Sequence, residues 1–204
     1  MRKAFFTILL TTFCGLNILA QANVEREEYD VYAFVLKDIY KENIRTYSSA
    51  ADFVILDRTI ECDSSDMTRI KGLKKDLEQK NQTSFVLERK FPVKYTYFLI
   101  NQDELDKFFA EGKIESNKIL EETKKQGKVG IDMGGLIWQP FYQKYPEAVG
   151  YNSFSRVGFS PNRQFAALCV ASEASFNGFS RIYILKKVKG KWKIHFSSQD
   201  VWAA

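Results

Sequence analysis

The two cysteines beyond residue 22 and the single histidine are the residues with the most specific chemistry in this sequence. Cys62 lies in a polar segment, Cys169 in an apolar run, and His195 in a run that alternates polar and apolar residues. A thiolate activated by an imidazole can act as a nucleophile. Cys169 and His195 fall on predicted strands with one strand between them, which places their backbones about 10 Å apart. The spacing therefore argues against a cysteine–histidine dyad.

Metal and cofactor motifs are the next chemistry to consider. One histidine excludes multi-histidine sites, and no C-x-x-C or H-E-x-x-H pair is present. The glycine-rich motifs that hold phosphates or dinucleotides are missing as well. The sequence predicts neither a metal nor a cofactor.

Cys62 and Cys169 also allow a structural interpretation. In an oxidising compartment such a pair forms a disulfide, which would close a loop of about 100 residues. The alternative is that Cys169 is a small buried apolar residue and Cys62 an exposed thiol. Composition alone leaves both open.

Three residues are candidates for ligand binding: Trp138, Tyr142 and Arg156. Arg156 is predicted within a strand, where it either pairs with a carboxylate such as Asp57 or lines a pocket for an anionic ligand. Trp138 and Tyr142 belong to an aromatic segment. That segment forms either a small helix packed on the sheet or a ligand or partner surface.

The N-terminal residues set the expected compartment. Residues 1–22 combine a basic start, an apolar run and a final Ala20-Gln21-Ala22, the layout of a secretory signal peptide. A retained membrane anchor and lipidation of Cys14 are the competing interpretations. We expect a signal peptide over 1–22 and one domain over 23–204, in the periplasm or outside the cell.

Charge and composition exclude two classes of partner. The formal net charge is +5, and loss of Arg2 and Lys3 with the signal peptide would leave about +3. Lysines are scattered among acids, whereas nucleic-acid binding needs a concentrated basic face. No later segment is apolar enough to span a membrane. The expected partner is therefore an unidentified ligand or an envelope protein.

The elements that must position these residues begin with alternating helices and strands. We expect a helix over 24–40 with Tyr32, Val35, Leu36 and Ile39 on its buried face. Asn101 and Glu104 form a capping box at the start of a further helix that Gly112 should end. The other expected elements are strand 53–56, helix 66–80, strand 93–100, exposed helix 115–126 and a flexible connection over 132–135.

The last fifty residues predict an antiparallel meander. Four strand-like runs, over 153–159, 165–174, 181–187 and 191–197, are separated by turn dipeptides. The second and third runs have apolar residues on both faces and should be central and covered. The fourth should place Trp192, Ile194 and Phe196 on one face. The fold class is therefore α+β, with N-terminal helices packed on an antiparallel sheet that ends in a four-stranded meander.

The C-terminal third resembles an uncharacterised family of exported bacterial proteins. The resemblance rests on Trp138-x-x-Phe141-Tyr142-x-x-Tyr145-Pro146, on Ser155-Arg156-Val157-Gly158-Phe159 and Ala167-Leu168, and on Leu185-x-Lys187-x-x-Gly190-Lys191-Trp192. The family's glycine-rich stretch is only partly matched by residues 173–178. The resemblance implies export and the sheet, and it brings no catalytic residue to this chain.

These observations favour one function and leave two alternatives. With no catalytic set assembled by the sequence, we expect an exported domain that binds a ligand or partner without catalysis. An exported hydrolase would need a cleft that joins Arg156 to carboxylates of raised pKa, or a serine nucleophile. An accessory envelope protein would need a large exposed apolar patch.

Overall fold

The computed structural model describes residues 26–45, 52–63, 70, 72–127, 132–175 and 177–203. The predicted signal peptide and residues 66–69 of the second predicted helix lie outside the described residues.

In the described part of the chain, seven strands form one mixed sheet in the order β2-β1-β3-β5-β6-β7, with β4 paired to β5 beside that path. The strands are β1 (Asp52–Leu56), β2 (Tyr97–Ile100), β3 (Ala148–Phe154), β4 (Gly158–Phe159), β5 (Phe165–Glu173), β6 (Asn177–Val188) and β7 (Lys191–Ala203). With its helices the chain has the predicted α+β fold. The predicted strand 93–100 begins four residues later, at Tyr97.

The antiparallel meander is confirmed. β3 and β4 pair with β5, β5 pairs with β6, and β6 pairs with β7, all antiparallel. The predicted strand 153–159 is divided between β3 and β4, because residues 155–157 leave the regular ladder. β1 is parallel to both β2 and β3, so the sheet is not antiparallel throughout. Parallel neighbours need long crossover connections, and the helical segments between these strands supply them.

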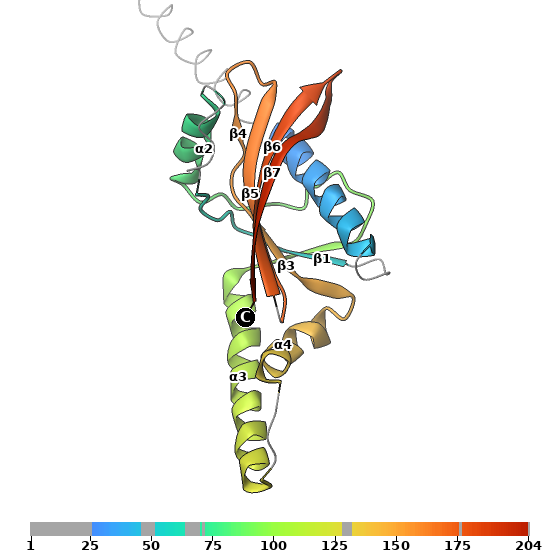
Figure 1. Ribbon diagram of the computed structural model, residues 1–204, viewed down its shortest axis with the longest axis vertical. Coiled ribbons are helices and arrows are strands. Elements are labelled where there is room, and N and C mark those ends of the chain that lie inside the picture. The colour runs from blue at the N-terminus through green and yellow to red at the C-terminus, as the bar shows by residue number, and fades with distance from the viewer. Residues whose placement is uncertain are drawn as a thin grey trace, which may run out of the picture.

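The N-terminal helix, described over residues 26–45, covers one face of the sheet (Figure 1). Its predicted apolar stripe is confirmed, since Tyr32, Val35, Leu36 and Ile39 are all buried in the largest core cluster. The predicted helix 24–40 ends too early, because the observed helix continues five residues further.

The opposite face is covered by three helices in two groups: α2 (Leu73–Asn81) packs over β4 and β5, and α3 (Gln102–Lys125) lies beside α4 (Met133–Lys144) (Figure 1). Leu73 and Leu77 of α2 are fully buried against β5 and β6. Trp138 and Phe141 of α4 join the core cluster behind β1 and β3. The central strands are therefore covered on both faces, as their apolar residues require.

α3 is longer than the sequence suggested. The predicted N-cap is confirmed at its start, where the Glu104 amide donates to Asn101 Oδ1 at 2.8 Å. The prediction that Gly112 ends the helix is wrong, because α3 continues to Lys125. Gly112 is buried, and a Cβ there would overlap the Ile137 carbonyl oxygen of α4. Glycine at this position therefore permits the close approach of the two helices.

Residues 132–135 are not a flexible connection. Asp132 is the N-cap of α4, and its Oδ1 accepts a hydrogen bond from the Gly135 amide at 3.0 Å. Residues from Met133 onward form the first turn of the helix. The glycines concealed this helix start, because their low helix propensity masked the capping signal.

We expect Gly112→Ala to destabilise the protein, although alanine is the better helix former by about 1 kcal/mol. The added methyl group must displace the Ile137 backbone, so the free energy of unfolding should fall by about 1–3 kcal/mol. Urea denaturation followed by circular dichroism measures the change.

Asn117→Ala, at an exposed position of the same helix, is the matched control for that substitution. It should leave the free energy unchanged or raise it by a few tenths of a kcal/mol (roughly 0.3). A stabilising Gly112→Ala would show that the α3–α4 contact does not need glycine.

The predicted alternation along β7 is wrong beyond His195. Ile194 lies opposite Leu185 but Phe196 lies opposite Ile184, so the register shifts by one residue at His195. Directly opposed residues share a face of a sheet. Because Leu185 and Ile184 point to opposite faces, so do Ile194 and Phe196. A bulge therefore leaves both side chains exposed, at 41% and 47% respectively.

Candidate functional site

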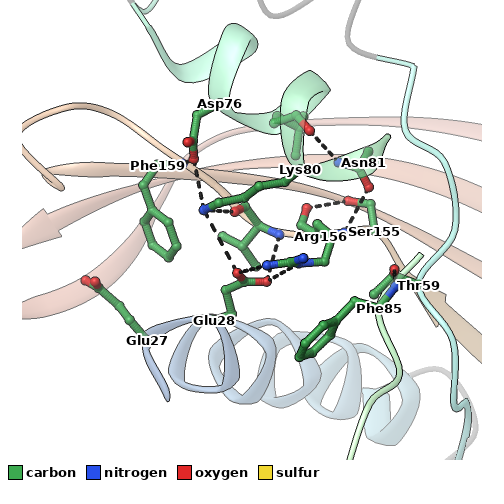
Figure 2. A network of polar contacts seen from close by, with 12 residues as sticks. Glu27, Glu28, Thr59, Asp76, Lys80, Asn81, Phe85, Ser155, Arg156 and Phe159 are labelled. Carbon is green, nitrogen blue, oxygen red and sulfur yellow. Dashed lines mark hydrogen bonds and ion pairs between the residues drawn. The ribbon is translucent and has the colours of Figure 1, made fainter. Parts of the chain in front are cut away.

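Arg156 forms a bidentate ion pair at the junction of β3 and β4. Its Nε and Nη2 atoms donate to the two carboxylate oxygens of Glu28 at 2.9 and 2.8 Å (Figure 2). The Glu28 side chain is fully buried, and that of Arg156 is 16% exposed. The predicted pairing of Arg156 with a carboxylate is thus observed, but the partner is Glu28 of the N-terminal helix instead of Asp57.

Other polar groups complete this network around Glu28 (Figure 2). Lys80 of α2 approaches Glu28 at 3.9 Å and Asp76 at 2.9 Å, and it donates to the Val157 carbonyl oxygen at 2.9 Å. The Tyr32 hydroxyl donates to the Ser155 carbonyl oxygen at 3.0 Å. Burial, followed by the nearby Glu28 charge, raises the pKa of Tyr32. The network joins the N-terminal helix, α2 and the β3–β4 junction.

The arrangement around Arg156 is suited to structural support. Ser155 is fully buried; its hydroxyl accepts from the Cys169 amide at 2.9 Å and donates to the Arg156 carbonyl oxygen at 2.9 Å. A serine nucleophile needs a nearby base and access to substrate. Ser155 has backbone groups as its hydrogen-bond partners and is closed to solvent. Arg156 and Glu28 likewise satisfy each other.

Trp138 and Tyr142 lie on the opposite side of the sheet from Glu28. The Trp138 ring stacks between Tyr142 and Tyr151, with centroid distances of 5.7 and 5.9 Å. The Tyr142 hydroxyl donates to the Val149 carbonyl oxygen at 3.0 Å. Trp138 is 8% exposed. The stack anchors α4 to β3, and the structure does not bring these aromatic residues together with Arg156.

Cys62 and Cys169 form a disulfide, with Cα atoms 5.4 Å apart. The bond joins the loop after β1 to the central strand β5. His195 lies on β7, is exposed, and is separated from β5 by β6. A cysteine–histidine dyad is therefore excluded for two reasons. Cys169 has no free thiol, and His195 lies two strands away from it in the sheet.

One surface cavity was not predicted from the sequence. We call it the helix–hairpin groove: it lies between the N-terminal helix and the turn joining β6 to β7, and its volume is about 740 Å³. The aromatic side chains lining it are Phe34 and Trp192. The charged residues lining it are Arg26, Glu27, Asp30, Lys37, Asp38, Lys41, Lys187 and Lys191.

Glu27, one of the three acidic residues that line the groove, is held in ion pairs with two basic side chains. Glu27 accepts from Lys187 at 2.6 Å and from Arg163 at 2.5 Å. Burial alone would raise the pKa of Glu27, but these two hydrogen bonds outweigh it and the pKa is lowered. Asp38 accepts from the Tyr183 hydroxyl at 3.3 Å.

Three lysines of the groove remain available to a ligand. Among the described residues, no carboxylate lies within ion-pair distance of Lys37, Lys41 or Lys191. All three are exposed. Beside them, Lys187 lies 4.6 Å above the Trp192 ring. The groove therefore offers positive charge next to an aromatic wall, which suits an anion with an apolar body.

The sequence indicated part of this group of lysines. Lys37 and Lys41 are four residues apart on one helix, a spacing that places them on one face. Nothing local connects them with Lys191 and Trp192, which follow about 150 residues later. Only the packing of the helix on β6 and β7 brings the two sets together.

Neither a metal-binding cluster nor a membrane-spanning helix occurs among the described residues. Across the described ranges, no three histidine, cysteine or acidic side chains gather as a metal site would require. Within the same ranges, no helix combines the length and hydropathy needed to cross a membrane. Comparison with known proteins finds no matching family model, no similar curated protein and no similar solved structure.

Proposed function

We propose that this chain is an exported, non-catalytic binding protein and that the helix–hairpin groove holds its ligand. The observation that carries the proposal is the meeting of Lys37, Lys41 and Lys191 with the aromatic side chains Phe34 and Trp192. A volume of about 740 Å³ is in the range of small-molecule sites. The ligand class that fits is an organic anion with a flat apolar part.

Export agrees with the disulfide, because such bonds persist in oxidising compartments. The signal peptide proposed for residues 1–22 accounts for that location, in the periplasm or outside the cell. The hydrolase alternative gains no support at Arg156, where the carboxylate is buried in an ion pair and the neighbouring serine is closed to solvent.

The test uses two probes with the same ring and opposite charge, naphthalene sulfonate and naphthylmethylammonium. We expect the sulfonate to bind the protein at least about tenfold more tightly, as measured by isothermal titration calorimetry. Lys37→Glu/Lys41→Glu/Lys191→Glu should remove this preference, because it reverses all three unpaired charges. Added salt should weaken sulfonate binding to the unmodified protein.

The matched control reverses two exposed lysines on α3, Lys118 and Lys124, whose side chains are 65% and 61% exposed. Lys118→Glu/Lys124→Glu should leave sulfonate binding within about twofold of the unmodified protein, since the groove keeps its charges. Equal binding of both probes, or equal losses in the two variants, would contradict the proposed site.

A further inference from the structure

β7 forms one edge of the sheet, and its outer side has no partner strand in the described part of the chain. Residues 193–197 along this edge are all exposed. An unpaired edge presents backbone donors and acceptors that another extended segment can pair with. We propose that this edge binds an extended, acidic segment of a partner protein, which adds to the sheet beside β7.

The bulge at His195 determines how such a partner must approach. Ile194 and Phe196 are both exposed, yet they project from opposite faces of the sheet. A partner resting on one face would cover one of these side chains and leave the other in water. A strand added at the edge places its own side chains next to both. The exposed apolar surface therefore fits strand addition better than docking on a face.

Charge indicates the chemistry of the added segment. Lys191 and Lys193 are exposed, and no carboxylate occurs between Lys191 and Ser198. Acidic residues opposite these lysines would form favourable cross-strand pairs. A second copy would instead bring another pair of lysines with no acid in the same stretch. The complementary partner is therefore an acidic extended segment of a different protein.

This surface shares Lys191 with the helix–hairpin groove, but its exposed apolar side chains lie outside the groove. Neither Ile194 nor Phe196 lines the groove. If the protein binds naphthalene sulfonate but no acidic strand, the proposal for the β7 edge is wrong and the groove proposal stands. If the protein binds the acidic strand but not the sulfonate, the groove proposal alone is wrong.

The probes are two capped peptides of about eight residues, the length of an ordinary strand. One alternates glutamate with valine, and the other has lysine in place of each glutamate. We expect the acidic peptide to bind at least about tenfold more tightly by calorimetry and to slow amide hydrogen exchange in β7. Ile194→Ser/Phe196→Ser should weaken binding at least about tenfold, because it removes the two apolar side chains beside which the added strand packs and changes no charge.

Two controls separate strand pairing from other effects. Ile114→Ser alters a side chain on α3 that is 58% exposed and should not change peptide binding. An acidic peptide N-methylated on alternate amides should not bind, since it lacks the donors for the ladder, and this control needs no protein variant. The proposal would be overturned by binding that does not depend on peptide charge, that tolerates N-methylation or that protects amides outside β7. A dimer seen by sedimentation and abolished by Ile194→Ser/Phe196→Ser would also overturn it, because the occupant would then be a second copy.

Discussion

Replacing Glu28 with alanine should lower the free energy of unfolding by about 3–5 kcal/mol, the usual cost of removing one partner of a buried ion pair. Glu28 accepts two hydrogen bonds from Arg156 and is fully enclosed. Alanine would leave the largely buried Arg156 guanidinium without its counter-charge, and Lys80 would lose its second carboxylate. Urea denaturation at neutral pH, followed by circular dichroism, measures the loss.

Two further variants identify the cause. Glu28→Met/Arg156→Met removes both charges and should recover much of the lost stability, because no unpaired charge remains. Glu121→Ala removes one partner of an exposed pair with Lys124 on α3 and should cost less than about 1 kcal/mol. A cost below 1 kcal/mol (roughly a fivefold change in the folding equilibrium) for Glu28→Ala itself would show that the network does not hold the helix in place.

Cys62→Ser/Cys169→Ser is expected to have a comparable effect. The disulfide joins residues 107 positions apart. In the chain-entropy model, a bond that closes a loop of this length stabilises the folded state by about 4–5 kcal/mol, chiefly by restricting the unfolded chain. Engineered and native disulfides often deliver less than this value, so it is the upper limit of the expected loss. Denaturation of the oxidised protein and of the double variant gives the difference.

Reduction supplies the control for that experiment. A reducing agent should destabilise the unmodified protein by a similar amount and leave Cys62→Ser/Cys169→Ser unaffected. Intact mass after alkylation should show the added label on these two cysteines only when reduction comes first. Labelling without reduction in the folded protein would mean that the bond is not formed.

Local features were predictable because their causes are local. The capping interaction of Asn101 and Glu104 depends on residues three apart, and the buried stripe of the N-terminal helix follows from a repeat within one element. The Cys62–Cys169 bond could be anticipated because only one pair remained beyond residue 22. That Arg156 would meet a carboxylate was predicted from its place in an apolar stretch.

Most of the failures share one cause, since they depend on contacts between distant segments. The carboxylate beside Arg156 proved to be Glu28, 128 residues away, and local sequence gives no means of choosing among the acids. Gly112 was predicted to end a helix. Glycine is needed there because the backbone of Ile137, in another helix, approaches closely, and local sequence does not show that contact. The bulge at His195 became visible only from the pairing of β7 with β6. The helix–hairpin groove needed the same long-range placement.

The ion pairs of the N-terminal helix also determine when the chain can fold. This helix is synthesised before the basic side chains that hold it. Glu28 pairs with Arg156, Glu42 with Arg181 and Glu27 with Lys187, and the sequence separations are 128, 139 and 160 residues. Contacts this distant make folding slow and prevent the helix from docking on a partly synthesised chain. On a nascent chain, the helix therefore cannot complete these ion pairs until Lys187 has been synthesised.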